Sequence, residues 1–367
     1  YGDHRDLHLS IRRQRQMCIR DRVSTLYKTA DTHFEDHYTT ECETLLKNIC
    51  GRKHALLTTS GTASINIMLL AADINPGDNV ITTSYSCPAT VMPIKLMGAN
   101  PIFYDVNRYG CQDVADITHT AKAILVTGLY GDSCDFDKID HPMVLNDSAQ
   151  CMGGLYKNKS SVSYGDMSIL SFATNKNCPV FGTYGAVLTD DDNLAKKVWL
   201  MRRNGYKNRD VGNNITHIGM NAQPHEDKAL QLFCSLGHLE KWQTRRVEIG
   251  KYYQEELEKL NINVRPSPSY SKTNNHKFCI FVDNKSLFRD KMMEYGVECQ
   301  THYTYNFSKV PLLSKQLDSN FQYTEQYKKH AISLPNSPWL TDVEAETVIQ
   351  TIKKCMTDAD KGVTING

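Results

Sequence analysis

Between residues 52 and 190 the chain alternates short apolar runs with segments of helical period, and this alternation constrains the fold more than any other feature. Strands that are buried on both faces appear as continuous apolar runs, and helical connections between them cover both faces of a parallel sheet. We therefore predict a large α/β domain with a mostly parallel, seven-stranded type of sheet between helices. The predicted strands are 55–59, 79–82, 101–106, 123–127, 143–147, 168–173 and 186–189.

The pattern changes after Pro224. Residues 225–260 predict a long helical stretch with a break near Gly237 or Gly250. Thr341, followed three residues later by Glu344, predicts the capping box of a last helix. The domain prediction is a large α/β domain over 23–240 and a smaller α+β domain over 241–367. In the smaller domain we predict strands at 276–283 and 297–301 and helices at 287–295 and 341–356.

Composition excludes several classes of protein. Lys and Arg number 42 against 41 Asp and Glu, so no charge surplus calls for nucleic acid or an anionic membrane. No apolar run approaches the roughly 18 residues needed to cross a bilayer. The 12 cysteines include no C-x-x-C pair, so a zinc ribbon is not supported. We predict a cytoplasmic protein with reduced thiols, no metal site, and no nucleic-acid or membrane partner.

The first 22 residues are unlike the rest, with six arginines and no lysine. No apolar core follows, which excludes a signal peptide. A basic arm that touches a partner is one interpretation. Translated sequencing-adapter read-through is another, and residues 1–22 are therefore treated as a non-native or disordered leader outside the fold.

Residues 59–64 (Thr-Ser-Gly-Thr-Ala-Ser) stand where a predicted strand ends and a helix begins. A helix N-terminus offers unpaired N–H groups and a positive dipole end, and Gly61 lets the backbone approach an anion closely. The segment therefore predicts a phosphate-binding turn. A simple helix cap is the alternative, because Ser and Thr cap helices widely.

Asp147 and Lys176 each follow an apolar strand at the edge where open α/β sheets bind ligands. A buried carboxylate there can hold a proton on a heteroaromatic nitrogen, although a strand-end Asp often only caps the next turn. A partly desolvated lysine has a lowered pKa and becomes a usable nucleophile, although most lysines are surface charges. Along the chain a phosphate-binding turn comes first, then an acid, then a lysine. In this order the three features fit a single cofactor.

Seven short motifs occur in sequence over most of the chain. Each is weak alone, and their joint order is specific. From about Glu41 to Lys354 the chain resembles the DegT/DnrJ/EryC1/StrS family of sugar aminotransferases, in the fold-type-I pyridoxal-phosphate superfamily. The motifs that carry the resemblance lie at 60–63, 76–81, 98–101, 146–150, 171–177, 296–303 and 333–335.

The resemblance implies a role for each matched residue. Lys176 matches the lysine that holds pyridoxal 5'-phosphate as a Schiff base and moves the proton, and Asp147 matches the acid that faces the pyridine nitrogen. Gln150 matches the side chain near the phenolic oxygen. Six further positions complete the assignments: Gly61, Thr62 and Ser171 as phosphate contacts, Asn221 as a phosphate contact reaching across a homodimer with shared active sites, and His302 and Tyr303 beside the sugar-nucleotide pocket.

Three positions depart from the family pattern. Cys87 stands where the family has an aromatic residue that stacks on the cofactor ring, so Cys87 is expected to cover the ring with less contact area. The segment 177–186 is about one residue longer than usual and lacks the usual acid. Gln223 replaces an arginine and removes a positive charge near the phosphate or the incoming carboxylate.

The implied activity is transfer of an amino group from an amino acid, glutamate first, to a nucleotide-linked keto-sugar, as in polysaccharide biosynthesis. A sugar dehydratase on the same fold is one alternative. Such relatives often carry histidine in place of the Schiff-base lysine, and Lys176 is retained here. A catalytically inactive, ligand-sensing protein is the other, since a fold does not fix a function.

Overall fold

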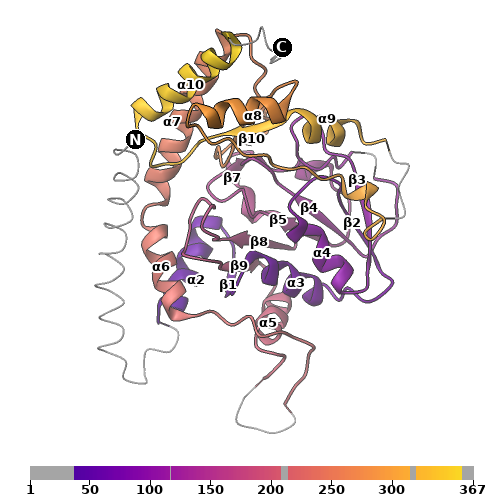
Figure 1. Ribbon diagram of the computed structural model, residues 1–367. Helices are drawn as coiled ribbons and strands as arrows, with labels where there is room; N and C mark the ends of the chain where they lie inside the picture. The colour runs from indigo at the N-terminus through magenta and orange to yellow at the C-terminus, as the bar shows by residue number, and fades with distance from the viewer. Residues whose placement is uncertain (1–36, 116, 208–213, 315–319, 358–367) are drawn as a thin grey trace.

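This computed structural model describes residues 37–115, 117–207, 214–314 and 320–357. Their main feature is a seven-stranded sheet of order β1-β9-β8-β5-β4-β2-β3 (Figure 1). β9 pairs antiparallel with β1 and β8, and the other neighbouring strands are parallel. The prediction of a mostly parallel α/β sheet is confirmed. The strands are β1 (His54–Thr58), β2 (Asn79–Thr83), β3 (Asn100–Tyr104), β4 (Ala123–Thr127), β5 (Val144–Asp147), β8 (Met167–Ser171) and β9 (Gly185–Thr189).

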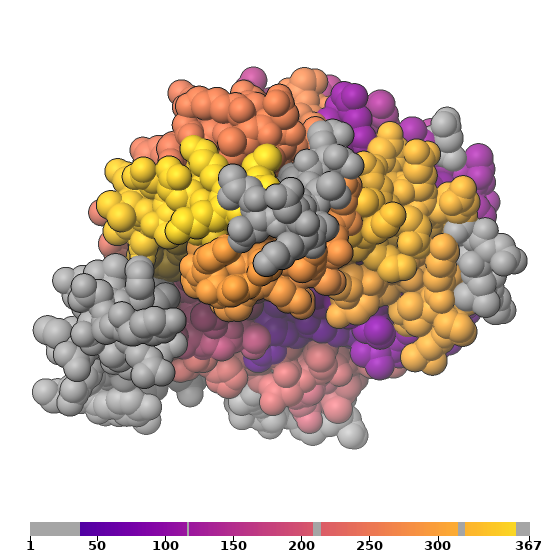
Figure 2. All heavy atoms as spheres, turned by 45° about the horizontal axis from the view of Figure 1, so that its top comes forward, coloured from indigo at the N-terminus to yellow at the C-terminus, as the bar shows by residue number. Residues whose placement is uncertain are grey.

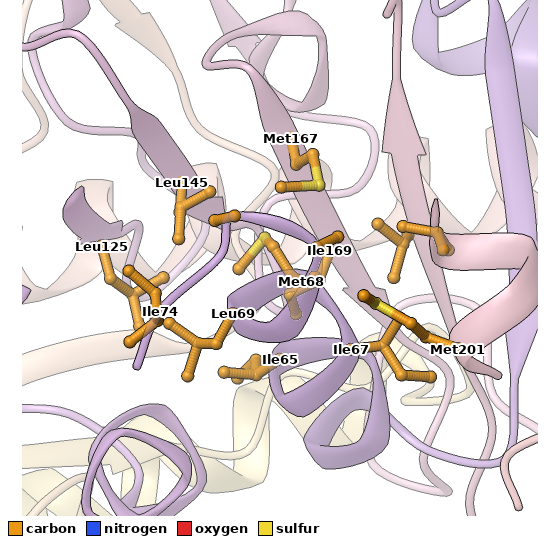
Figure 3. Close-up of a cluster of buried hydrophobic side chains, with 14 of the residues drawn as sticks. Ile65, Ile67, Met68, Leu69, Ile74, Leu125, Leu145, Met167, Ile169 and Met201 are labelled. Atoms are coloured by element: carbon orange, nitrogen blue, oxygen red, sulfur yellow. The ribbon is translucent and has the colours of Figure 1, made fainter. Parts of the chain in front are cut away.

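Successive strand residues supply opposite faces of this sheet, as the two-residue period of a strand requires. Ile169 packs in a core with α3 and α5, whereas its neighbour Leu170 packs in a second core with α2 and α6. Figure 3 shows the first core, in which Met68 of α3 lies against strand side chains such as Leu145. The flanking helices are α2 (His37–Cys50), α3 (Gly61–Ala71), α4 (Pro88–Leu96), α5 (Asp192–Met201) and α6 (Glu226–Leu236).

The C-terminal part forms a smaller layer of helices against a two-stranded antiparallel sheet. Its residues, orange to yellow in Figure 2, spread over the violet, N-terminal part of the molecule. The predicted break near Gly237 is confirmed, since α6 ends before it and a second helix follows. The elements are α7 (Leu239–Glu258), β11 (Phe278–Phe281), α8 (Lys285–Glu294), α9 (Gln322–His330), β12 (Ala331–Leu334) and α10 (Asp342–Thr357).

The capping box predicted for the last helix is present. The Thr341 N–H donates to Glu344 Oε2 at 2.8 Å, and the Glu344 N–H donates to Thr341 Oγ1 at 3.2 Å. These two bonds satisfy N–H groups that lack an intrahelical acceptor, and they fix the start of α10.

One predicted strand is wrong. Residues 297–301 form no strand, and only Gln300 pairs with β12, through Ser333. Val297 and Cys299 are buried as a strand pattern requires. The chain then turns so that the His302 carbonyl accepts from two tyrosine hydroxyls, and these contacts replace a continuous ladder.

Three small strands also occupy a three-stranded sheet, β6 (Leu155–Tyr156), β7 (Lys159–Ser160) and β10 (Ser271–Lys272). No helix in the described part of the chain is long and apolar enough to cross a membrane. None of the eleven cysteines that the structure describes forms a disulfide. The domain boundary near residue 240 stays a prediction, and the leader at 1–22 lies outside the described residues.

Candidate functional site

The N-terminus of α3 lies at the carboxyl end of β1. Ser60 caps it, accepting a hydrogen bond on Oγ from the Ala63 N–H at 3.0 Å. The N–H groups of Gly61 and Thr62 lie in the first turn, where no intrahelical acceptor exists. Ser171, at the end of β8, packs so closely that a Cβ on Gly61 would lie 2.8 Å from the Ser171 Cβ. The structure thus brings the three predicted phosphate contacts together.

Asp147 is buried at the end of β5, 4% exposed, with both carboxylate oxygens held. Oδ2 accepts from the Thr90 hydroxyl at 2.7 Å, and Oδ1 accepts from the Ala149 N–H at 3.1 Å. Burial raises the pKa of Asp147, while these hydrogen bonds and the charge of Lys176 act in the opposite direction. The hydrogen bonds therefore fix the orientation of the carboxyl group and oppose the effect of burial on its pKa.

Lys176 follows β8 by five residues, and its N–H donates to the Ala173 carbonyl at 2.9 Å. Burial lowers the pKa of the Lys176 amine, and the charges of Asp147 and Cys87 oppose this effect. Each of Lys176 and Asp147 therefore acts on the ionisation of the other. Lys176 and Asp147 are thus close enough for their charges to interact.

Gln150 links this pocket to the C-terminal part. Its Oε1 accepts from the Tyr130 N–H at 2.8 Å, and its Nε2 donates to the Tyr303 hydroxyl at 2.8 Å. His302 Nδ1 lies 3.1 Å from the Ser333 hydroxyl, and burial lowers the pKa of His302 to about 3. His302 is thus a neutral imidazole at physiological pH.

Tyr85 and Tyr130 are contacts that the sequence did not predict for the site. Their hydroxyls lie 3.0 Å apart, and both donate to the His302 carbonyl. The Tyr303 N–H donates to the Tyr85 hydroxyl at 2.5 Å. These bonds hold residues 302 and 303 against the large sheet. The only signal in the sequence was the pair of tyrosines after apolar runs, which is also the pattern of ordinary core residues.

Cys87 caps the N-terminus of α4 without a side-chain hydrogen bond and is half-buried. Tyr85 is fully buried and turned into another cluster, so it does not replace the missing aromatic ring. The Tyr303 hydroxyl does interact electrostatically with Cys87 and Asp147. Tyr303 is therefore an aromatic side chain close enough to interact with Cys87, the position where the family has an aromatic residue.

The segment 177–186, which follows Lys176, is held by side-chain contacts at two positions. Asn177 Oδ1 lies 2.5 Å from Nδ1 of the buried His276, and the Phe181 N–H donates to Gln231 Oε1 at 2.9 Å. A cavity of 950 Å³ opens beside Phe181, between this segment and α6 and α7. Its lining includes neither Lys176 nor Asp147, so it is separate from the candidate site.

Asn221 is exposed, and its backbone pairs with Arg203 in an isolated bridge. Gln223 is half-buried. The structure therefore leaves Asn221 accessible to a second copy of the chain, and its role across a dimer stays a prediction. No group of His, Cys, Asp and Glu among the described residues has an arrangement that could hold a metal ion.

Substituting Gly61 with alanine should destabilise the protein. The new Cβ would lie 2.8 Å from the Ser171 Cβ, too close for two carbon atoms, so β8 or α3 must shift. Overpacking of this kind costs about 1–3 kcal/mol in the free energy of unfolding. Urea unfolding of both proteins measures the difference.

Gly237→Ala is the matched control. A Cβ there would meet its nearest atom, the Cys234 carbonyl oxygen, at 3.6 Å, which is an ordinary contact. We expect its stability to stay within about 1 kcal/mol of the parent. Equal losses at both positions would mean that the contact between Gly61 and Ser171 is not tight.

The DegT/DnrJ/EryC1/StrS aminotransferase family matches residues 19–353. This chain belongs to that family. A dTDP-3-amino-3,6-dideoxy-alpha-D-galactopyranose transaminase of Aneurinibacillus thermoaerophilus is 29% identical over 83% of this chain and 86% of its own length.

Two further relatives are similar over most of their length. A UDP-2-acetamido-2-deoxy-3-oxo-D-glucuronate aminotransferase of Pseudomonas aeruginosa is 27% identical over 82% of this chain and 86% of its own. The crystal structure of NtdA from Bacillus subtilis, with bound cofactor PMP, has a TM-score of 0.81 and 27% identity. The match covers 92% of this chain and 81% of that chain. The family's fold therefore extends over nearly the whole described chain.

Proposed function

We propose that this family member uses pyridoxal 5'-phosphate to transfer an amino group from an amino acid, glutamate first, to a keto-sugar linked to a nucleotide. The observation that carries the proposal is a buried carboxylate, Asp147, held by Thr90 and the Ala149 N–H at the end of β5 and close enough to Lys176 for the two charges to interact. The relatives named above act on nucleotide sugars, which supports the acceptor class.

The residues present fit this cofactor. Its phosphate requires N–H donors at a close approach, and the first turn of α3 beside Ser171 offers them. Its ring nitrogen requires a held carboxylate, and Asp147 is held by Thr90 and the Ala149 N–H. Its aldehyde requires an amine with a lowered pKa, and Lys176 has one.

When bound, pyridoxal phosphate supplies an aldehyde for amino groups and a ring that withdraws electrons from the adjacent carbon. Lys176 would hold it through the amine, whose pKa burial lowers. The same side chain would be the group that moves a proton at the substrate carbon. Asp147 would hold the proton on the ring nitrogen.

Other residues would bind and orient the cofactor and the sugar. Gly61, Thr62 and Ser171 bind the phosphate, Cys87 covers one face of the ring, and Gln150 lies near its phenolic oxygen. His302 and Tyr303 line the place of the sugar. Asn221 reaches the phosphate of a second copy, so the proposed active unit is a homodimer with shared sites.

Incubation with glutamate and a panel of nucleotide keto-sugars tests the proposal. We expect 2-oxoglutarate to form in proportion to an aminated sugar nucleotide. Loss of a sugar hydroxyl without stoichiometric use of the donor would instead identify a dehydratase. Cofactor binding with no turnover on any acceptor would favour the ligand-sensing alternative.

A further inference from the structure

Lys176 is followed by a residue that is held only through its side chain. Asn177 is buried, and neither its main-chain N–H nor its carbonyl has a hydrogen-bond partner among the described residues. Its Nδ2 donates to the Met152 carbonyl at 3.1 Å, and its Oδ1 lies 2.5 Å from Nδ1 of His276. Two side-chain hydrogen bonds therefore fix the main chain directly after Lys176.

The hydrogen bonds also assign the donor between Asn177 and His276. The contact with the Met152 carbonyl requires a donor, so it identifies the nitrogen of the Asn177 amide. The amide oxygen that remains can only accept, so His276 donates from Nδ1. Burial, and next the charge of Lys176, lowers the pKa of His276 well below its usual value. The imidazole is therefore neutral at physiological pH, and its single N–H is the one that Asn177 accepts.

The segment that carries His276 is itself anchored beside the site. The His276 main-chain N–H donates to Asn274 Oδ1 at 2.7 Å. Asn274 Nδ2 donates in turn to the carbonyls of Gln150 and Met152, at 2.8 Å and 2.9 Å. The Met152 carbonyl thus accepts from both Asn274 and Asn177. His276 is therefore placed by contacts with the same turn that holds Asn177.

This contact joins the C-terminal part of the chain to the lysine of the site. His276 lies two residues before β11, whereas Lys176 lies five residues after β8 of the large sheet. A shift of the segment before β11 would therefore reach Lys176 through the side chain of Asn177. A misplacement of about 1 Å can cost a reacting group about 100-fold in rate, so the position of the lysine main chain matters for its chemistry.

We propose that His276 positions Lys176 for covalent attachment of the cofactor, by donating a hydrogen bond from Nδ1 to the side chain of Asn177. This inference rests on the proposed function, and it gives a positioning role to a residue outside the family motifs quoted above. Because His276 acts through Asn177, its loss should weaken the bond that Lys176 makes with the cofactor. The phosphate contacts at α3 should be unaffected.

The test measures the dissociation constants of two forms of the cofactor by equilibrium dialysis of the loaded, full-length protein. Pyridoxal 5'-phosphate can bond to Lys176, whereas pyridoxamine 5'-phosphate carries an amine in place of the aldehyde and cannot. His276→Phe keeps a ring but leaves Asn177 Oδ1 buried without a donor. It should weaken binding of pyridoxal 5'-phosphate by about 10- to 100-fold and change that of pyridoxamine 5'-phosphate by less than about twofold. His276→Asn restores an N–H near the place of Nδ1 and should recover most of the loss.

His141→Phe is the matched control. The two ring nitrogens of His141 lie 3.0 Å and 3.2 Å from the carbonyls of Met143 and Ala121, in the loop before β5 and at the opposite end of that strand from Asp147. The substitution removes an imidazole hydrogen bond far along the sheet from the site. It should lower stability in urea and leave the ratio of the two dissociation constants unchanged.

Two results would overturn the inference. One is an unchanged affinity for pyridoxal 5'-phosphate in His276→Phe. The other is equal weakening of both cofactor forms, which would mean a general loss of structure at the site. Asn177→Leu removes the acceptor and should give the same selective loss, so it serves as the test if His276→Phe does not fold. A parent protein in which borohydride reduction attaches no cofactor to Lys176 would refute the proposed function and this inference with it.

Discussion

Replacing Lys176 with alanine should abolish the absorbance of the lysine-bound cofactor at the violet edge of the spectrum and lower turnover by about four orders of magnitude. In the proposed function the amine of Lys176 is the covalent anchor, and among the described residues Lys176 is the only lysine whose charge shifts the pKa of Asp147. No other described residue offers an amine in that relation. Absorbance spectra and the rate of 2-oxoglutarate formation measure the two effects.

Lys176→Arg is the informative partner of this variant. Arginine keeps a positive charge beside Asp147, so the electrostatic balance of the pocket is retained, but a guanidinium does not form the covalent bond. We expect the same loss of absorbance and turnover. Lys272→Ala, at an exposed position on β10, should leave both unchanged. A violet absorbance that survives in either Lys176 variant would mean that another amine holds the cofactor.

Asp147→Asn should leave the cofactor attached and lower turnover by about 10²- to 10⁴-fold, the usual range for a group that holds a catalytic proton. Asparagine has the shape of aspartate, and its oxygen can still accept from Thr90 or from the Ala149 N–H. It carries no charge, so it does not stabilise a proton on the ring nitrogen. Rates with saturating glutamate and cofactor isolate this effect from binding.

Thr90→Val is a graded control for the same carboxylate. It removes the hydroxyl that donates to Asp147 Oδ2 at 2.7 Å, but it keeps the charge. We expect a smaller loss than in Asp147→Asn. The Asp147→Asn result would contradict the account if turnover remained near that of the parent while the cofactor stayed attached, because the carboxylate would then have no part in the chemistry.

The alternation of apolar runs predicted the strands of the large sheet well. A buried strand is apolar along its own length, so it can be found without knowing which strands pair with it. β4 was predicted at its observed bounds, and β5 and β8 within two residues. α5 was missed although Asp191 caps it through the Asn193 and Leu194 N–H groups, because its buried face is short. β12 was missed because its pairing with β11 is set by a contact between segments about fifty residues apart.

The candidate site likewise contains residues that the local sequence predicts and contacts that only tertiary packing creates. Gly61, Asp147 and Lys176 could be found because each stands beside a strand or helix end that the sequence marks. The link from Gln150 to Tyr303 and the hydrogen bond from Tyr85 to the His302 carbonyl could not. They join residues separated by more than a hundred positions. Only the packing of the C-terminal layer on the large sheet brings them together.

Reduction of the cofactor-loaded protein with borohydride, followed by peptide mass spectrometry, identifies the lysine that holds the cofactor. Borohydride makes the bond between cofactor and lysine permanent, so the modified residue can be read from the peptide mass. We expect the pyridoxyl group on Lys176. A pyridoxyl group on any other lysine, with Lys176 unmodified, would contradict the proposed function.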